Sequence, residues 1–251
     1  MTARPLDGRR IVVTRSEDQA DGLAEALRDL GAEPLLVPSI RSTPPDDPAA
    51  LRSAAAALGG ARWVGMTSPS GVRYGWPAVR AAWPDGLPDG LGVAVVGPGT
   101  AEALRGYGVA PDFLPSESAG DAFADELPVA PGDRVVLLRS HIARGAIAAR
   151  LRQRGADVTD AVAYHTVTAA DPADVGRALD RRPDAVTFTS PSTVRGFLAG
   201  VRDRGRLAGV ALVPIGPVTA EAVADAGLAA AAVPDDYTIP GLLDALARHF
   251  S

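Results

Sequence analysis

MTSPSGVR at residues 66–73 returns in the second half of the chain as FTSPSTVR at residues 188–195. Each copy begins in an apolar run, residues 63–66 or 185–188, of the kind that forms a buried parallel strand. Serine is a good helix N-cap, and the proline after it suits the first helical position. Each phrase therefore predicts a strand, a tight turn and a helix start at the carboxyl edge of a sheet, where ligands of open α/β sheets bind. One such turn is usually a plain cap, but two matching turns indicate more than capping.

The repetition extends beyond these two phrases. RIVVTRS matches RVVLLRS, and VGPGTAEA matches IGPVTAEA, at residues 10–16, 134–140, 96–103 and 215–222. The chain therefore consists of two homologous halves, about 9–127 and 133–246. This period is too long for a many-repeat solenoid, whose units are about 20–50 residues long.

Apolar runs and helical patterns alternate along both halves. Expected strands lie at about 11–14, 34–37, 63–67, 92–96, 112–114, 134–138, 157–163, 185–189, 210–215 and 230–233. Expected helices lie at about 18–30, 48–58, 70–82, 99–107, 119–127, 142–154, 172–181, 192–203, 217–226 and 239–249. This alternation predicts parallel sheets with helices on both faces. The expected fold class is α/β, with two similar lobes that each hold a parallel five-stranded sheet flanked by helices.

Two stretches interrupt the alternation at the same point of each half, after its second strand. Residues 37–45 are proline-rich and extended, and residues 162–168 are β-prone. A chain would cross between lobes at such points. We therefore expect lobes that do not follow the sequence halves, with the two stretches as paired linkers and a hinge.

Composition excludes several kinds of chemistry. The sequence has no cysteine, which excludes disulfides, thiol nucleophiles and cysteine-bound metals. All 25 basic residues are arginine, so Schiff-base chemistry and a P-loop lysine are also excluded. The net charge of −5 does not favour nucleic-acid binding. With no signal-like segment and no apolar run of membrane-spanning length, we expect a cytoplasmic protein without membrane contact.

The strand-to-helix junctions carry the candidate binding residues. Helix N-termini with hydroxyl groups or glycine beside them suit carboxylate or phosphate groups. The candidates at these junctions are Ser68, Ser70, Gly99, Thr100, Ser190, Ser192 and Thr219. Each helix-dipole contact contributes only about 0.3–1 kcal/mol, so affinity depends on several of them. A dinucleotide site is a poor alternative, because GPGT at residues 97–100 lacks the GxGxxG spacing.

Arginines and one tyrosine add further candidates. Arg15 and the pair Arg139 and Ser140 leave their strands at the same edge, and Arg144 follows one helical turn later. Arginine there either forks onto carboxylates or is a solvated charge at a strand end. Tyr164 either packs its ring on a linker strand or directs its phenol into a cleft between lobes as a hydrogen-bond donor or acid. The histidines show no ligand spacing, so we expect no metal site.

Taken in order, these motifs resemble the uroporphyrinogen-III synthase family, enzymes that close the linear tetrapyrrole hydroxymethylbilane with inversion of ring D. The resemblance rests on residues 12–15, 67–69, 96–100, 163–166, 188–192 and 215–220. It therefore spans almost the whole chain in the family's order.

The resemblance implies two α/β lobes joined by a two-stranded linker, with one lobe built from both chain ends. The lobes would be residues 1–37 with 169–251, and residues 44–161, with linkers at about 38–43 and 162–168. The resemblance also implies no cofactor, no metal and a monomer that takes a small-molecule substrate, hydroxymethylbilane. Transient contact with the preceding enzyme of the pathway is a further expectation.

Residue roles follow from the same resemblance. Tyr164 matches the family's linker tyrosine, thought to assist loss of the substrate hydroxyl. Thr100 and Thr219 match the threonines at the cleft. The turn positions near substrate carboxylates are matched by Ser68, Ser190 and Ser192. Ser70 stands where some relatives carry a basic residue, which puts a direct charge contact there in doubt.

Two other function classes compete with this interpretation. One is a non-catalytic two-lobed binding or sensor protein for an anionic small molecule, and the other is a nucleotide-using α/β enzyme. Product analysis discriminates the first from the enzyme, because the enzyme yields the type III isomer and a binder leaves the spontaneous type I isomer. A thermal-shift assay with nucleotides tests the second.

Overall fold

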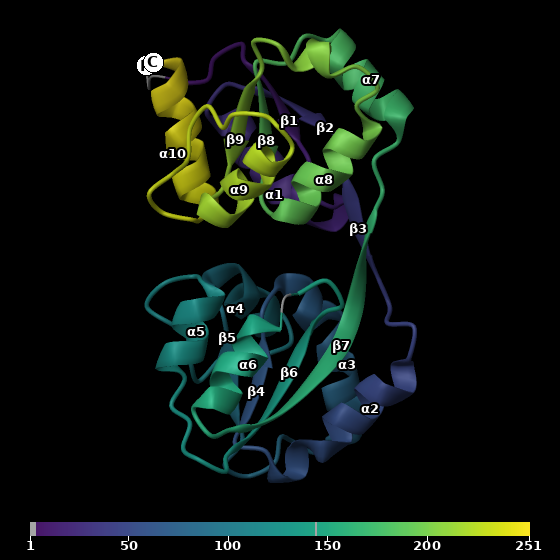
Figure 1. The fold of residues 1–251 in the computed structure, drawn as a ribbon, viewed down its shortest axis with the longest axis vertical. Helices are drawn as coiled ribbons and strands as arrows, with labels where there is room; N and C mark the ends of the chain where they lie inside the picture. The colour runs from purple at the N-terminus through teal and green to yellow at the C-terminus, as the bar shows by residue number, and fades with distance from the viewer. Residues whose placement is uncertain (1–3, 144) are drawn as a thin grey trace. The chain divides into compact units, whose positions relative to one another are not determined.

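The computed structural model describes residues 4–143 and 145–251, and the chain forms two compact units. The terminal unit contains Met1–Arg41 and Val167–Ser251, so it is built from both ends of the chain, and the central unit contains Ser42–Thr166. Both passages between units fall inside a strand, in β3 (Ile40–Thr43) and in β7 (Asp157–Thr168). Figure 1 labels the elements of both units.

The terminal unit is organised on a sheet with the strand order β2-β1-β8-β9. Its strands are β1 (Arg10–Val13), β2 (Glu33–Leu36), β8 (Ala185–Phe188) and β9 (Ala211–Pro214). β1 pairs in parallel with β2 and β8, and β8 pairs in parallel with β9. Strands that are apolar along their length must be covered on both faces.

Helices cover both faces of this sheet. They are α1 (Glu17–Asp29), α7 (Pro172–Asp180), α8 (Pro191–Gly200), α9 (Pro217–Asp225) and α10 (Ile239–Phe250), with the 3₁₀ turn Arg204–Leu207. Helices α7, α8 and α9 pack with Val12 and Phe188, and helices α1 and α10 pack with Val13 and Ala185 on the other face. Figure 1 shows α8 and α10 on opposite sides of β8 and β9.

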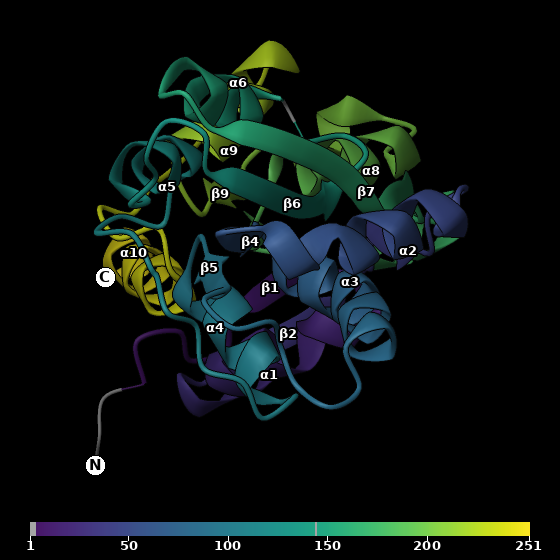
Figure 2. The same cartoon turned by 90° about the horizontal axis from the view of Figure 1, so that it is seen from below.

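The central unit is organised on a sheet with the strand order β3-β7-β6-β4-β5. Its further strands are β4 (Trp63–Met66), β5 (Gly92–Val95) and β6 (Arg134–Ser140). β4 pairs in parallel with β5 and β6, and β6 pairs in parallel with β7. The carboxyl ends of β4, β5 and β6 therefore lie at one edge of the sheet, and Figure 2 shows β7, β6 and β4 side by side.

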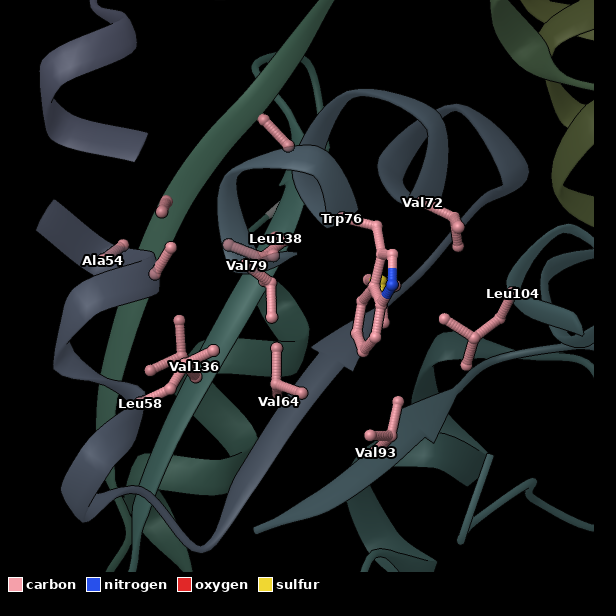
Figure 3. Close-up of a cluster of buried hydrophobic side chains, with 14 of the residues drawn as sticks. Ala54, Leu58, Val64, Val72, Trp76, Val79, Val93, Leu104, Val136 and Leu138 are labelled. Carbon is pink, nitrogen blue, oxygen red and sulfur yellow. The ribbon is translucent and has the colours of Figure 1, made fainter. Parts of the chain in front are cut away.

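Helices cover both faces of this sheet as well. They are α2 (Pro48–Ala56), α3 (Pro69–Ala82), α4 (Pro98–Arg105), α5 (Gly120–Glu126) and α6 (Ala146–Gln153), with the 3₁₀ turn Ala57–Gly60. Helices α2, α3 and α4 pack on the face of Val64, and α5 and α6 pack on the face of Trp63 (Figure 2). Figure 3 shows Trp76 of α3 between Val64, Val93 and Leu104. Within the described ranges, no helix is long and apolar enough to span a membrane.

The α/β class and the repeated strand-turn-helix units are as predicted, but two parallel five-stranded sheets are not. The described residues form sheets of four and five strands, and the fifth strand of the central sheet is β3, which makes this sheet mixed. The expected strands at 112–114 and 230–233 are wrong, because each makes too few ladder bonds. Phe113 forms an isolated bridge with Ala94, and Ala231 N donates to Leu212 O at 2.8 Å.

Candidate active site

Ser68 caps helix α3 at the carboxyl edge of the central sheet. The strand β4 ends at Met66 and the helix begins at Pro69. Ser68 has extended backbone, and its Oγ accepts a hydrogen bond from Gly71 N at 3.0 Å. This is the N-cap geometry that the Ser-Pro motif predicts. The first turn of α3 therefore presents its N–H groups and its positive dipole end at this edge.

The phenol of Tyr164 lies directly against this cap. Tyr164 Oη and Ser68 Oγ are 2.9 Å apart. The tyrosine is 7% exposed, and its ring stacks on Tyr74 of α3 with the ring centroids 6.0 Å apart and the planes at 18°. Tyr74 is fixed in turn, because its hydroxyl donates to Ser42 O at 2.8 Å. A buried phenol is therefore held in one orientation at a helix N-terminus.

An irregularity in β7 sets the direction of Tyr164. The regular pairing of β6 with β7 ends at Arg139 with Val162, and the next pair is Ser140 with Tyr164. The strand β7 therefore has one residue more than β6 at this point. Side chains alternate between the two faces of a regular strand, so Ala163 and Tyr164 would point in opposite directions. Both pack in the buried cluster that includes α3, because the bulge re-aims Tyr164.

Arg139 stabilises the same irregularity in the pairing of β6 with β7. Its Nη2 donates to Asp160 Oδ2 at 2.5 Å and its Nε donates to Asp160 Oδ1. Its Nη1 donates to the carbonyl oxygens of Ser140 and Ala143, at 3.0 and 2.7 Å. Since all three guanidinium nitrogens are engaged inside the central unit, this geometry favours a structural role for Arg139 over the predicted contact with substrate.

Other predicted residues of the central unit lie around the same edge. Ser70 is buried and its Oγ accepts from Ser42 Oγ at 3.0 Å. Thr100 is buried in the first turn of α4. A Cβ placed on Gly99 would lie 4.0 Å from Pro69, so the N-termini of α3 and α4 are neighbours. The structure therefore brings the first turns of these two helices together with the Ser68–Tyr164 pair.

A pair of histidines lies beside the backbone of Tyr164, one next to it on β7 and one directly after the end of β6. The rings of His141 and His165 lie 4.3 Å apart, and His141 N donates to Tyr164 O at 3.1 Å. Thr166 N donates to His141 Nδ1 at 3.3 Å. Partial burial and the like charge of His165 lower the pKa of His141 below its ordinary value of 6.5, and the charge of Asp46 opposes this. The pair therefore favours a neutral His141.

Next to this pair, a cavity of about 630 Å³ lies between α2 and β7, with Asp46, Ala54, Val162 and His165 in its lining. Neither Ser68 nor Tyr164 lines this cavity. In the ranges that the structure describes, no group of three or more His, Cys, Asp or Glu side chains is placed to hold a metal ion.

In the terminal unit, Ser190 repeats the cap of Ser68 with different partners. Thr193 N donates to Ser190 Oγ at 3.3 Å, and Ser190 N donates to Thr193 Oγ1 at 3.2 Å, which forms a capping box. Ser192 lies in the first turn of this helix, and Thr219 is buried in the first turn of α9. These helix starts supply N–H groups at the carboxyl edge of the terminal sheet.

Arg15, the counterpart of Arg139 in the repeat, has a different environment. Its Nη2 donates to Gln19 Oε1 at 2.9 Å, while its buried Nε finds no hydrogen-bond partner among the described residues. Burial lowers the pKa of Arg15 below its ordinary value, and the charge of Asp18 opposes this. A buried N–H group without a partner is costly, so a ligand that accepted from it would relieve the cost.

The register of the two sheets explains why the two arginines differ. Leu137 pairs with Asp160 in the central sheet, and Val13 pairs with Leu36 at the matching place in the terminal sheet. Leucine offers no carboxylate to Arg15. Of the guanidinium nitrogens of Arg15, Nη2 is bonded to Gln19 and the buried Nε has no partner among the described residues.

Sequence reasoning missed three residues of this site, and one candidate lies outside the described residues. Tyr74 lies one helical turn after Ser70, and that spacing could have flagged it as a neighbour. Ser42 and Thr166 have no motif that marks them. Ser140, which was predicted, bonds through Oγ to Thr166 Oγ1 at 3.2 Å. Arg144 falls outside the ranges 4–143 and 145–251.

Comparisons with known proteins agree on one family. The family model described as "Uroporphyrinogen-III synthase HemD" matches residues 21–244. A uroporphyrinogen-III synthase of Synechococcus elongatus is 30% identical over 259 residues, which cover 98% of this chain and 97% of that protein. A porphyrin biosynthesis protein HemD of Ruminiclostridium josui is 29% identical, over 97% of this chain and 49% of that protein.

Two solved structures share the fold. A mutant uroporphyrinogen III synthase of Thermus thermophilus has a TM-score of 0.63 at 21% identity, over 96% of this chain and 98% of that chain. The uroporphyrinogen-III synthetase of Helicobacter pylori has a TM-score of 0.60 at 16% identity, over 97% of this chain and 100% of that chain.

Proposed function

We propose how individual residues carry the reaction, on the premise that the chain belongs to the uroporphyrinogen-III synthase family. It is an enzyme that cyclises hydroxymethylbilane, in porphyrin biosynthesis. The alternative of a non-catalytic binding or sensor protein is not favoured by these matches. Membership of the family establishes the reaction, and the residue roles are our own assignment.

Tyr164 is the proposed general acid. It would donate its phenolic proton to the hydroxyl group that leaves the bilane, so that the group departs as water and an azafulvene cation remains. Attack of this cation at the substituted carbon of ring D would give a spiro intermediate, which fragments and recloses with ring D inverted. The observation that carries the assignment is the 7% exposed phenol of Tyr164, held 2.9 Å from Ser68 Oγ at the edge where α3 begins.

Substrate binding is assigned to local donors, because the net charge of −5 does not attract a polyanion by its overall field. Arg15 is the proposed arginine contact, supported by its buried and unpartnered Nε. The helix starts proposed to bind carboxylates are those of Ser68, Ser70, Gly99, Thr100, Ser190, Ser192 and Thr219. Through these contacts the enzyme would hold the bilane folded so that the spiro route is faster than direct closure.

Conversion of Tyr164→Phe tests the acid. The variant keeps the ring and its stacking on Tyr74 but loses the proton. General acid catalysis contributes about 10²–10⁴-fold, so kcat should fall within that range while KM stays close to the wild-type value. The assay feeds hydroxymethylbilane to the purified protein and separates the product isomers, with type III formation lost and spontaneous type I left.

Tyr107→Phe is the matched control, because Tyr107 is 38% exposed and lies in the turn after α4. It should keep the wild-type kcat and the type III product. Wild-type turnover in the Tyr164→Phe variant would remove Tyr164 from the chemistry.

We also propose that the enzyme is a cytoplasmic monomer that meets the preceding pathway enzyme only transiently. Light scattering during gel filtration should give the mass of one chain. A stable dimer at micromolar concentration would contradict the proposal.

A further inference from the structure

We infer that Ser68 is a positioning residue that donates its hydroxyl hydrogen to Tyr164 and thereby keeps the phenolic proton directed at the substrate. The inference rests on the proposed role of Tyr164 as the acid. It goes beyond that role because it assigns the direction of the Ser68–Tyr164 hydrogen bond and a function for the serine other than substrate contact.

Three contacts fix the geometry of the pair. Gly71 N donates to Ser68 Oγ at 3.0 Å, and Ser68 Oγ lies 2.9 Å from Tyr164 Oη. Ring stacking with Tyr74, whose own hydroxyl is anchored on Ser42 O, prevents the phenol from turning away. The serine and the tyrosine therefore meet in one arrangement before any substrate binds.

The direction of the hydrogen bond follows from what each oxygen must do. A hydroxyl group has one donor and two acceptor sites. Ser68 Oγ already accepts from the backbone of α3, and its hydrogen can be given to Tyr164 Oη. The phenolic hydrogen is then free for the leaving group. If Tyr164 donated to Ser68 instead, its only hydroxyl hydrogen would be engaged and could not be transferred to the leaving group.

The resulting chain also stabilises the charge that forms. Donors run from Gly71 N through Ser68 Oγ to Tyr164 Oη, and each bond in such a chain polarises the next. As the phenol loses its proton, negative charge develops on Oη, where the serine hydrogen and the positive end of α3 both lie. Ser68 therefore acts on the rate of hydroxyl loss more than on substrate affinity.

Three substitutions separate this role from simple helix capping. Ser68→Ala removes both the cap and the donor, and kcat should fall about tenfold to a hundredfold with little change in KM. Ser68→Thr keeps cap and donor and should restore most of the kcat. Ser68→Asp keeps a strong cap but offers Tyr164 only an acceptor, so its kcat should be at least as low as that of the alanine variant although its fold is as stable as wild type.

Asp47→Ala is the matched control for the loss of a cap. Asp47 caps α2 in the same unit by accepting from Ala49 N and Ala50 N, and neither of these bonds involves Tyr164. This variant should lower the melting temperature as Ser68→Ala does and should leave kcat unchanged. A matching loss of kcat in Asp47→Ala would mean that capping alone explains the serine.

The double variant distinguishes failure of this inference from failure of the proposed function. If both hold, Tyr164→Phe with Ser68→Ala has the same kcat as Tyr164→Phe alone, because the serine hydroxyl acts on the chemical step only through the phenol. A slow Tyr164→Phe beside a fully active Ser68→Asp would overturn the role of Ser68 and leave the acid in place. Full activity of Tyr164→Phe would overturn the proposed acid itself.

Discussion

Removal of the Arg139 guanidinium should destabilise the central unit and disturb the direction of Tyr164. The substitution is Arg139→Met, which keeps the length of the apolar stem. It removes hydrogen bonds to Asp160, Ser140 and Ala143 and leaves the carboxylate of Asp160 without its cation. Since the ion pair lies at the bulge that re-aims Tyr164, stability and catalysis should both respond.

The size of the effect follows from the burial of the pair. Loss of one partner from a fully buried pair costs about 3–5 kcal/mol, and a surface pair contributes about 0–1 kcal/mol. The side chains of Arg139 and Asp160 are 16% and 15% exposed, so the pair is close to the buried limit. We therefore expect Arg139→Met to lower the free energy of unfolding by about 2–4 kcal/mol.

Urea unfolding and steady-state kinetics measure the two consequences. Arg150→Met is the matched control, because Arg150 pairs with Asp125 while their side chains are 45% and 46% exposed. It should cost about 1 kcal/mol or less and should leave kcat unchanged. Adding Asp160→Leu to Arg139→Met should recover part of the lost stability, since an apolar pair leaves no unpaired charge.

The structural role of Arg139 is refuted if Arg139→Met is as stable as Arg150→Met and its defect is a raised KM with normal kcat. That result would return Arg139 to the role that its place at the strand end first suggested, a contact with a substrate carboxylate.

Three further changes test other parts of the structure. Leu36→Asp should give Arg15 a carboxylate partner like the one that Asp160 gives Arg139, so that the KM for hydroxymethylbilane rises severalfold while stability is kept. An unchanged KM would show that Arg15 does not contact substrate. His141→Gln should flatten the decline of melting temperature below about pH 6.5, because the folded pKa of His141 is lowered. Its stabilising contribution is present above the unfolded pKa and is lost as the pH falls through the folded pKa, and an unaltered pH profile would contradict this. Gly196→Ala should lower the free energy of unfolding by about 1–3 kcal/mol, because its methyl would lie 2.2 Å from a backbone carbonyl oxygen. Gly22→Ala has open space around it and should raise the free energy of unfolding by about 0.5–1 kcal/mol. Equal urea midpoints would show that α8 does not approach the neighbouring backbone so closely.

The strand-turn-helix elements could be predicted because their sequence signals lie within a short stretch of chain. A buried strand, a Ser-Pro cap and a following helix occur within a dozen neighbouring residues, and the caps of Ser68 and Ser190 form as the motif predicts. The expected strands at 112–114 and 230–233 failed for the same reason. Apolar composition marks a short segment as buried, but whether it joins a ladder depends on partners that are distant in the sequence.

The candidate site could be predicted only in part from the sequence, because its geometry depends on the pairing of residues across strands. Strand alternation alone would place Ala163 and Tyr164 on opposite faces, and the bulge that puts both in one cluster appears only in the register with β6. The partner of Arg139 is Asp160, on the neighbouring strand, and no motif near the arginine in the sequence predicts this ion pair. Residue type indicates the candidates, and strand register determines which of them contact one another.

The two units of the chain show how side chains at matched positions of a duplicated scaffold meet different partners. Each unit has an arginine near the carboxyl end of one strand, Arg15 after β1 or Arg139 within β6, and a serine cap after another strand. The partners differ by single side chains. Asp160 engages Arg139 where Leu36 leaves Arg15 open, and Tyr164 meets Ser68 where Thr193 closes a capping box on Ser190. In the roles we propose, the central unit uses its arginine for structure and its serine to position the acid. The terminal unit uses its serine for structure and its arginine to bind the anion. In the proposed assignment, the partner that each side chain meets within its own unit therefore decides whether it serves structure or chemistry.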